Sequence, residues 1–360
     1  MDSRMMLFVS VLVSLLLTGC MHIEQEVIDD IQLTTAGGYE YTDDSMILVT
    51  TVYPNYQPDK SVINETLTDT AKLSKEARDK LNLQSEKPVV SGKVEVTLYE
   101  WETAEKGIFD FLDTLERDPS IGSSIYLGVV DGSPKELLSK QYGNQDNGIY
   151  LSNLIEQNIE TGQIPKTNLH QFLYKFYADG IDPTLPVLKQ EDGKVKLTGI
   201  GLFAEDKLVG QLEEEQFFTF KLLLERKGQK GSYSIKLNED NDISIYNISS
   251  GRNFDIQKPM TNSEIIINVN LKATVSEYQD GILNKQKTTR LEKEIKELLE
   301  QDSQEMIQQF QEKGIDPLGI GDQVRSRTRN WDPKKWKELY PDLQITVKVN
   351  VDLLESGVIE

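Results

Sequence analysis

The chain has 360 residues, of which 27% are charged and 38% are hydrophobic, and its formal net charge is −20. This balance excludes wholesale disorder, and the length favours roughly two or three domains. A strongly acidic chain is repelled by phosphate backbones, so nucleic acid is not an expected partner. The single cysteine excludes an internal disulfide.

The first twenty residues have the pattern of a secretory signal that ends at a lipid-modified cysteine. Arg4 provides a positive charge, residues 7–17 form a largely apolar run, and Leu17-Thr18-Gly19-Cys20 closes the segment. The run has about 11 residues, about half of the ~20 that a spanning helix needs, so a transmembrane anchor is the weaker interpretation.

We therefore predict a lipoprotein signal peptide over residues 1–20 and a diacylglycerol anchor on Cys20. Two acyl chains are enough for stable attachment to a membrane, whereas one chain binds reversibly. The alternative is an ordinary cleavage site at which the cysteine is coincidental.

The first mature segment is predicted to contain strands and one exposed helix. Residues 46–53 are rich in β-branched side chains and predict a buried strand that Pro54 ends. Scattered apolar residues within 59–84 predict an exposed helix, and the alternation over 93–98 predicts a strand with one wet face.

The middle of the chain alternates between helices and strands. In chain order we expect a helix over 108–115, a strand over 125–130, a helix capped by Ser133, and helices over 154–159 and 169–177. Aromatic residues form a stripe on the last of these helices. Core packing is the simpler interpretation of that stripe, and a ligand-binding face is the alternative.

The second half is richer in strands. We expect strands over 194–203, 207–212, 233–237, 243–248, 265–275 and 345–351, a helix from Glu213 to Leu224 closed by Gly228, and a long helix over 291–310. Strands and helices follow one another irregularly, and the clearest strands alternate. This pattern favours a multi-domain α+β fold with mostly antiparallel mixed sheets and amphipathic helices over a doubly wound parallel sheet.

Prolines and a glycine indicate a domain boundary near residues 186–194. We expect an N-terminal region over 21–190, in which about 58–100 forms a smaller subdomain, and a C-terminal α+β domain over 194–360.

The tetrapeptide Gly-Ile-Asp-Pro occurs twice, at 180–183 and at 314–317, each time directly after a predicted helix. A helix stop explains both copies, because glycine adopts the left-handed turn and proline prevents continuation. No longer repeat accompanies them, so the sequence does not support an internal duplication.

The search for enzyme and cofactor sites gives little. The only histidines are His22 and His170, too few for a typical zinc site, and no nucleophile elbow occurs. Residues 199–204 match a dinucleotide fingerprint nominally, but they lie inside a predicted strand and not before a helix. Residues 240–251 resemble a calcium loop but fail at its sixth and twelfth positions. We predict no catalytic, cofactor-binding or metal site, although no pattern among the 59 acidic residues rules out a carboxylate pair.

A run of cations near the C-terminus breaks the acidic pattern. It comprises Arg325, Arg327, Arg329, Lys334, Lys335 and Lys337, with Trp331 and Trp336 among them. One interpretation is a solvated basic face with one buried tryptophan. The other is a docking patch for a membrane protein or for lipid headgroups, and the sequence leaves both open.

Several motifs together resemble the Ger(x)C family, the lipoprotein C subunit of the spore germinant receptor. They are the lipid-attachment motif Leu17-Thr18-Gly19-Cys20, Gly199-Ile200-Gly201-Leu202-Phe203, Asp206-Lys207-Leu208-Val209-Gly210, Asp316-Pro317-Leu318-Gly319-Ile320-Gly321, Trp336 and the closing Val347–Gly357. The resemblance covers nearly the whole mature chain. It departs at Met21-His22, where family members usually carry Trp-Asp.

The resemblance implies a three-domain α+β ectodomain without an enzyme site, held on the outer face of the spore inner membrane by the lipid on Cys20. It implies assembly with membrane-embedded receptor subunits of the A and B type, and no cofactor. The family motifs establish no germinant site. Two other functions compete with this reading: a solute-binding lipoprotein of a transporter, and a surface hydrolase, which the lack of a nucleophile motif disfavours.

Overall fold

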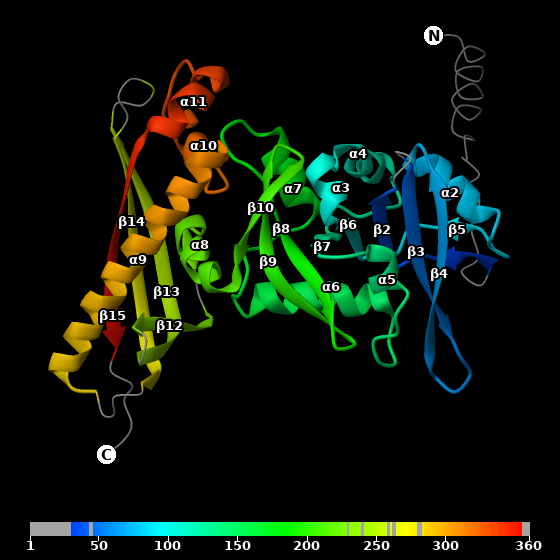
Figure 1. The fold of residues 1–360 in the computed structure, drawn as a ribbon, viewed down its shortest axis with the longest axis horizontal. Coiled ribbons are helices and arrows are strands. Elements are labelled where there is room, and N and C mark those ends of the chain that lie inside the picture. Colours follow the sequence, from blue (N-terminus) through cyan, green and yellow to red (C-terminus); the bar gives the residue numbers. More distant parts are fainter. Residues whose placement is uncertain are drawn as a thin grey trace, which may run out of the picture.

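The computed structural model describes residues 30–42, 46–228, 230–238, 241–257, 260, 264–278 and 283–354. Within them the chain forms a large mixed sheet and a smaller sheet that follow one another along the long axis of the molecule (Figure 1). A short parallel pair, β1 (Gln32–Leu33) with β5 (Val89–Val90), accompanies the large sheet. The α+β class expected from the sequence is confirmed.

The large sheet has eight strands in the order β10-β9-β8-β7-β6-β2-β3-β4. Its strands are β10 (Lys207–Glu213), β9 (Lys194–Ala204), β8 (Thr184–Glu191), β7 (Tyr126–Val130), β6 (Val96–Glu100), β2 (Ala36–Tyr41), β3 (Ile47–Tyr56) and β4 (Val62–Ala71). The four central strands are parallel, and an antiparallel segment extends the sheet at each end.

Helices cover both faces of the large sheet, as a parallel centre requires. One face carries α2 (Ser74–Asn82), α3 (Trp101–Lys106), α4 (Phe109–Arg117) and α7 (Leu169–Tyr177), and the other carries α5 (Pro134–Leu138) and α6 (Asn147–Glu160). Phe111 of α4 anchors the first layer, since its ring lies 4.8 Å from that of Tyr39 and 5.9 Å from that of Tyr99. The Ser133 cap of α5 is confirmed, because its hydroxyl accepts from the amide of Glu136.

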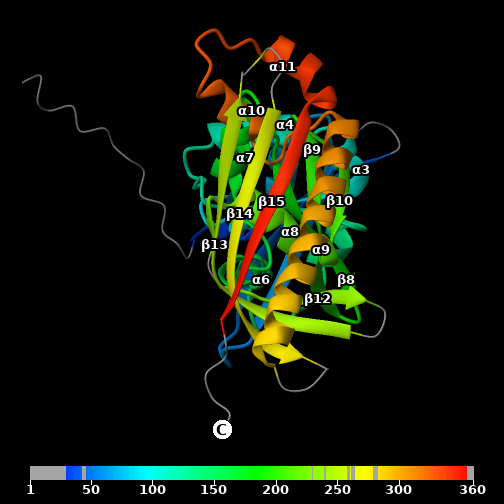
Figure 2. The ribbon, with the colours of Figure 1, turned by 90° about the vertical axis from the view of Figure 1, so that its left-hand side faces the viewer.

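The smaller sheet has five strands and one long helix. They are β11 (Lys227–Gly228), β12 (Ser232–Asn238), β13 (Asn241–Gln257), β14 (Glu264–Tyr278), β15 (Gln344–Leu354) and α9 (Lys285–Lys313). The alternating Ile265, Ile267 and Val269 face the core, and the opposite face of β14 is polar. Figure 2 shows β13, β14 and β15 from that outer face, with α9 beside β15. Glu292 and Glu300 of α9 accept from amides on the free edge of β15, which closes that edge to further strands.

The two sheets share one core. A single apolar cluster runs from α6 through α8 (Phe217–Leu224) to β13, β14 and β15. The predicted boundary at 186–194 covers most of β8 and its turn into β9, and both strands belong to the eight-stranded sheet. The second half of the chain therefore completes the large sheet before it builds its own.

Three local predictions are wrong. The helix expected within 59–84 is strand β4 followed by α2, because β4 is rich in β-branched residues and pairs with β3 over its whole length. Pro54 does not end β3, since it lies beyond the end of β2, where β3 has only one neighbour and a missing amide is tolerated. Gly228 is not a helix cap. It lies in β11, where it pairs with Ser250 of β13.

Candidate functional site

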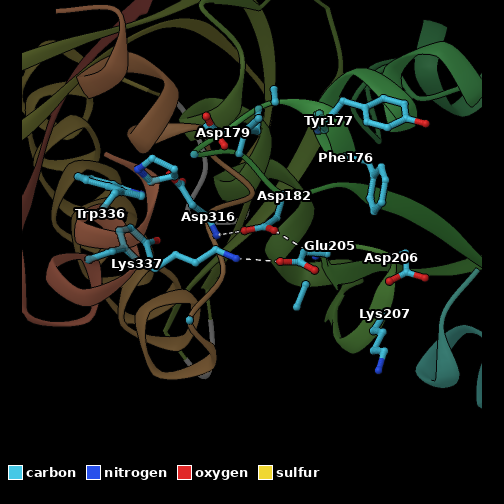
Figure 3. Close-up of a pocket in the computed structure, with 18 residues that line it drawn as sticks. Phe176, Tyr177, Asp179, Asp182, Glu205, Asp206, Lys207, Asp316, Trp336 and Lys337 are labelled. Atoms are coloured by element: carbon cyan, nitrogen blue, oxygen red, sulfur yellow. Dashed lines mark hydrogen bonds and ion pairs between the residues drawn. The ribbon is translucent and has the colours of Figure 1, made fainter. Parts of the chain in front are cut away.

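The two Gly-Ile-Asp-Pro segments, 180–183 and 314–317, meet between the sheets. Both glycines adopt the left-handed conformation, with φ of 79° at Gly180 and 65° at Gly314. The amide of Asp182 donates to the carbonyl oxygen of Asp316 at 2.9 Å. In return the amide of Asp316 donates to the Asp182 carboxylate at 2.6 Å (Figure 3). We call this reciprocal pairing of 180–183 with 314–317 the turn junction.

Asp316 also caps the helix that follows it, α10 (Ile320–Arg325). Its carboxylate accepts from the amides of Ile320 at 2.9 Å and Gly321 at 2.6 Å, and its side chain is buried. Burial raises the pKa of Asp316 to about 7, although the amide donors act in the opposite direction. The nearby carboxylate of Asp182 adds to the rise.

Close backbone contact completes the turn junction. The amide of Asp322 donates to the carbonyl oxygen of Gly180 at 2.8 Å. A β-carbon on Gly180 would lie only 2.6 Å from the carbonyl carbon of Gly321, so no side chain fits there. Trp336 also packs against Gly321 and is 4% exposed. Trp336, one of the two tryptophans of the basic run, is therefore part of the core.

A cavity of about 510 Å³ lies beside the turn junction. Its lining comes from the end of α7, the turn between β9 and β10, and α11 (Pro333–Leu339), and includes Lys175, Asp179, Asp182, Glu205, Lys207, Lys337 and Tyr340. The ammonium of Lys337 lies 2.8 Å from the Glu205 carboxylate at the rim (Figure 3). The cavity lining therefore mixes acidic and basic side chains with apolar ones.

A half-buried lysine and a buried tyrosine make the cavity unusual. Burial lowers the pKa of Lys175 to about 8, and the charge of Asp182 opposes this shift. The hydroxyl of Tyr340 is buried and has no hydrogen-bond partner in the described part of the chain. Burial, together with the charges of Asp316 and Asp182, raises the pKa of Tyr340 well above its usual value. A small polar molecule or ordered water could satisfy this hydroxyl.

The described residues hold no group of three or more His, Cys, Asp or Glu side chains that could bind a metal ion. His170 lies exposed on α7. Cys20, the signal segment 1–20, His22 and the end of the closing motif Val347–Gly357 lie outside the described residues. No helix in the described ranges combines the length and the apolar character needed to cross a membrane.

The basic run lies on α10, α11 and the loop between them. Arg325 is paired with Asp322 at 2.6 Å, and Arg327 donates to the carbonyl oxygen of Gln323 at 2.7 Å. Lys334 and Lys335 are exposed on the first turn of α11, which Asp332 caps. Trp331 is half-buried, with its ring 5.6 Å from that of Trp336.

Sequence reasoning found the two tetrapeptides but missed their pairing. The repeat was the available signal, and it was interpreted only as two helix stops. Asp182 and Asp316 are separated by 134 positions, and nothing in the local pattern of either segment indicates that the other is its partner.

Comparisons with known proteins agree with this architecture. Residues 24–190 match the family model described as spore germination protein N-terminal domain, and residues 198–357 match the one described as spore germination B3/GerAC like, C-terminal. The spore germination protein GerQC of Bacillus cereus is 28% identical over 97% of this chain and 98% of its own. The putative spore germination protein YfkR of Bacillus subtilis (strain 168) is 22% identical over 79% and 77%. The crystal structure of the GerBC protein superposes with a TM-score of 0.56 at 18% identity, covering 90% of this chain and 99% of that one, and shows the shared fold.

Proposed function

The chain belongs to the family of germinant receptor C subunits, and from that premise we propose that it is a non-catalytic lipoprotein subunit of a nutrient germinant receptor. In this proposal the lipid on Cys20 holds the protein on the outer face of the spore inner membrane. There it assembles with membrane-embedded subunits of the A and B type and is needed for germination.

The anchoring part rests on the leader. Leu17-Thr18-Gly19-Cys20 follows a positive residue and a short apolar run. Because no described helix is able to cross a membrane, the acyl chains on Cys20 would supply the attachment.

The turn junction is the observation that supports a scaffold role. It joins two sheets, which already share a core, through one backbone hydrogen bond from Asp182 to Asp316 and one from the Asp316 amide to the Asp182 carboxylate. Such a junction holds two surfaces in a fixed relation, which suits a subunit that couples partners. The cavity beside it lacks a nucleophile paired with a base among its lining residues.

A solute-binding lipoprotein of a transporter is the second candidate, and the cavity between the two sheets is the observation that favours it. Proteins of that class close two similar lobes around a cleft, whereas the two sheets here differ in size and topology. Binding of a small solute to the native state would raise the melting temperature of the mature chain. Transporter permease genes beside this gene, in place of membrane receptor subunit genes, would also favour the alternative.

Replacement of the anchor residue tests the proposal. Cys20→Ala should move the protein from the spore inner membrane to the soluble fraction and abolish the response to nutrient. Immunoblots of fractionated spores and the fall in optical density during germination measure the two effects. Ser14→Ala, within the apolar run, is the control and should leave both unchanged. Retention of the Cys20→Ala protein on the membrane with normal germination would contradict the anchor.

Assembly is tested separately. The wild-type protein, solubilised in detergent from spore membranes, should co-purify with the A and B type subunits. If it is recovered without them, the receptor assignment fails even where lipid anchoring holds.

A further inference from the structure

Part of the basic run carries positive charge that no described acidic side chain pairs with. Two of its cations are neutralised locally, since Arg325 pairs with Asp322 and Lys337 pairs with Glu205. The others are Arg327, Arg329, Lys334 and Lys335, all exposed and without an ion pair to any described acidic residue. The whole chain has a net charge of −20, so this cluster of cations differs from the acidic character of the rest of the protein.

Exposed aromatic side chains lie at the same end of the molecule. Tyr174 is 51% exposed and Tyr177 is 60% exposed, both on α7. Tyr174 is close enough to Arg325 to affect the pKa of that guanidinium, which the paired Asp322 chiefly raises. Tyr177 and Lys337 line the same cavity. Figures 1 and 2 both place α10 and α11 in the upper part of the molecule, and α7 lies below them at about the level of α3. We call the exposed side chains of Tyr174, Tyr177, Arg327, Arg329, Lys334 and Lys335 the basic-aromatic end.

We propose that the basic-aromatic end lies against the anionic headgroups of the membrane to which the protein is tethered. Lysine and arginine beside tyrosine is the combination found at the level of lipid headgroups, where the cations meet phosphate and the ring bridges polar and apolar layers. The core of a protein interface is depleted of lysine, whereas Lys334 and Lys335 are exposed here without an ion pair to a described acidic residue.

The proposed tether would hold the protein body close to a membrane. Residues 21–29 separate Cys20 from the described part of the chain, and even fully extended they would span only roughly 30 Å. This step rests on the proposed anchor. A body with a strong negative charge held so close to an anionic surface is repelled unless a positive face turns toward it.

Vesicle binding tests the proposal without relying on the anchor. An unlipidated form that begins after Cys20, residues 21–360, is mixed with vesicles of phosphatidylcholine alone or of phosphatidylcholine with phosphatidylglycerol, and the bound fraction is measured by co-sedimentation. We expect binding only to the vesicles that contain phosphatidylglycerol, and its loss at high salt. Lys334→Glu with Lys335→Glu should lower the partition coefficient at least ~30-fold, since each cation near the surface contributes about 1 kcal/mol.

A matched variant controls for net charge. Lys272→Glu with Lys348→Glu changes the total charge equally, but these lysines lie exposed on the outer face of the smaller sheet. This control should keep most of the binding, and circular dichroism should show all variants folded. Equal losses in the two double variants, or no binding by the wild-type chain, would overturn the proposal.

A third outcome identifies a protein partner. If the Lys334→Glu and Lys335→Glu variant binds vesicles normally but no longer co-purifies with the membrane subunits, the basic-aromatic end is a protein-docking surface and the lipid proposal is wrong. Membrane release of Cys20→Ala is a separate result, so failure of the anchor and failure of this proposal are distinguishable.

Discussion

The two copies of Gly-Ile-Asp-Pro have the same sequence but different surroundings. In each, the glycine adopts a left-handed turn after a helix. The aspartate of the second copy, Asp316, turns back and caps α10, and its side chain is buried. The aspartate of the first copy, Asp182, reaches across the chain, and its carboxylate accepts from the amides of Asp316 at 2.6 Å and Glu205 at 3.3 Å.

The residues that follow each copy explain the difference. After Pro317 the chain continues Leu318-Gly319-Ile320-Gly321, and Gly319 adopts a left-handed conformation that starts α10 over the Asp316 carboxylate. After Pro183 the chain enters β8, so no local amide is available to Asp182. A tetrapeptide can therefore define a turn, but its neighbours decide which amides its aspartate binds.

The largest expected effect concerns the buried carboxyl. The pKa of Asp316 rises from 3.8 to about 7 on folding because of burial, so the folded state favours the protonated form. Asp316 therefore contributes most stability below about pH 4, and this contribution is lost as the pH rises towards 7. By linkage the loss amounts to up to about 4 kcal/mol. Asp316→Asn should flatten the fall in unfolding free energy between pH 4 and 7, measured by urea denaturation.

The neighbours of Asp316 must be considered in that experiment. The carboxylate of Asp182, the guanidinium of Arg252 and the phenol of Tyr340 all interact with it electrostatically. Burial also raises the pKa of Asp182, so Asp182→Asn should change the slope in the same direction but less, since that side chain is partly exposed. Identical slopes for wild type and Asp316→Asn would show that Asp316 does not titrate in this range.

The next largest effects are expected when Gly314 and Gly180, the glycines of the turn junction, are replaced by alanine. Gly314→Ala should cost about 1–2 kcal/mol, because alanine disfavours the left-handed conformation but its β-carbon meets nothing within 4 Å. Gly180→Ala carries the same backbone cost and also places a β-carbon 2.6 Å from the Gly321 backbone, which adds about 1–3 kcal/mol of overpacking. Urea denaturation of the two variants measures the difference. Equal costs would mean that the turn junction opens without loss of stability.

The sequence predicted elements better than their partners. Helix α4, helix α7 and strand β14 were correctly expected because each has a clear local period and a stop signal. The error at β4 arose where Leu67 and Ala71 were assigned to a helix, although their neighbours favour a strand that depends on pairing with β3.

The candidate site was harder to predict than the elements, because contacts between distant parts of the chain bring its residues together. The cations at 325–337 were found because they cluster within 13 residues of the sequence, but Tyr177, which is exposed, was assigned to a core stripe. Leu169 and Phe172 of that stripe are buried, as expected, whereas Tyr177 at the end of α7 is 60% exposed. Local periodicity identifies the apolar face of a helix but not where the layer beneath it ends.

The smallest expected effect lies at the rim of the cavity. Lys337 and Glu205 are 2.8 Å apart, but their side chains are 71% and 67% exposed. Exposed ion pairs contribute about 0.2–1 kcal/mol and weaken with salt. Lys337→Ala should therefore lower the unfolding free energy by no more than about 0.5 kcal/mol, and Lys337→Arg, which keeps the charge, should change it less. A loss above about 2 kcal/mol, persisting at high salt, would mean that this rim contact and not the buried turn junction holds the two sheets together.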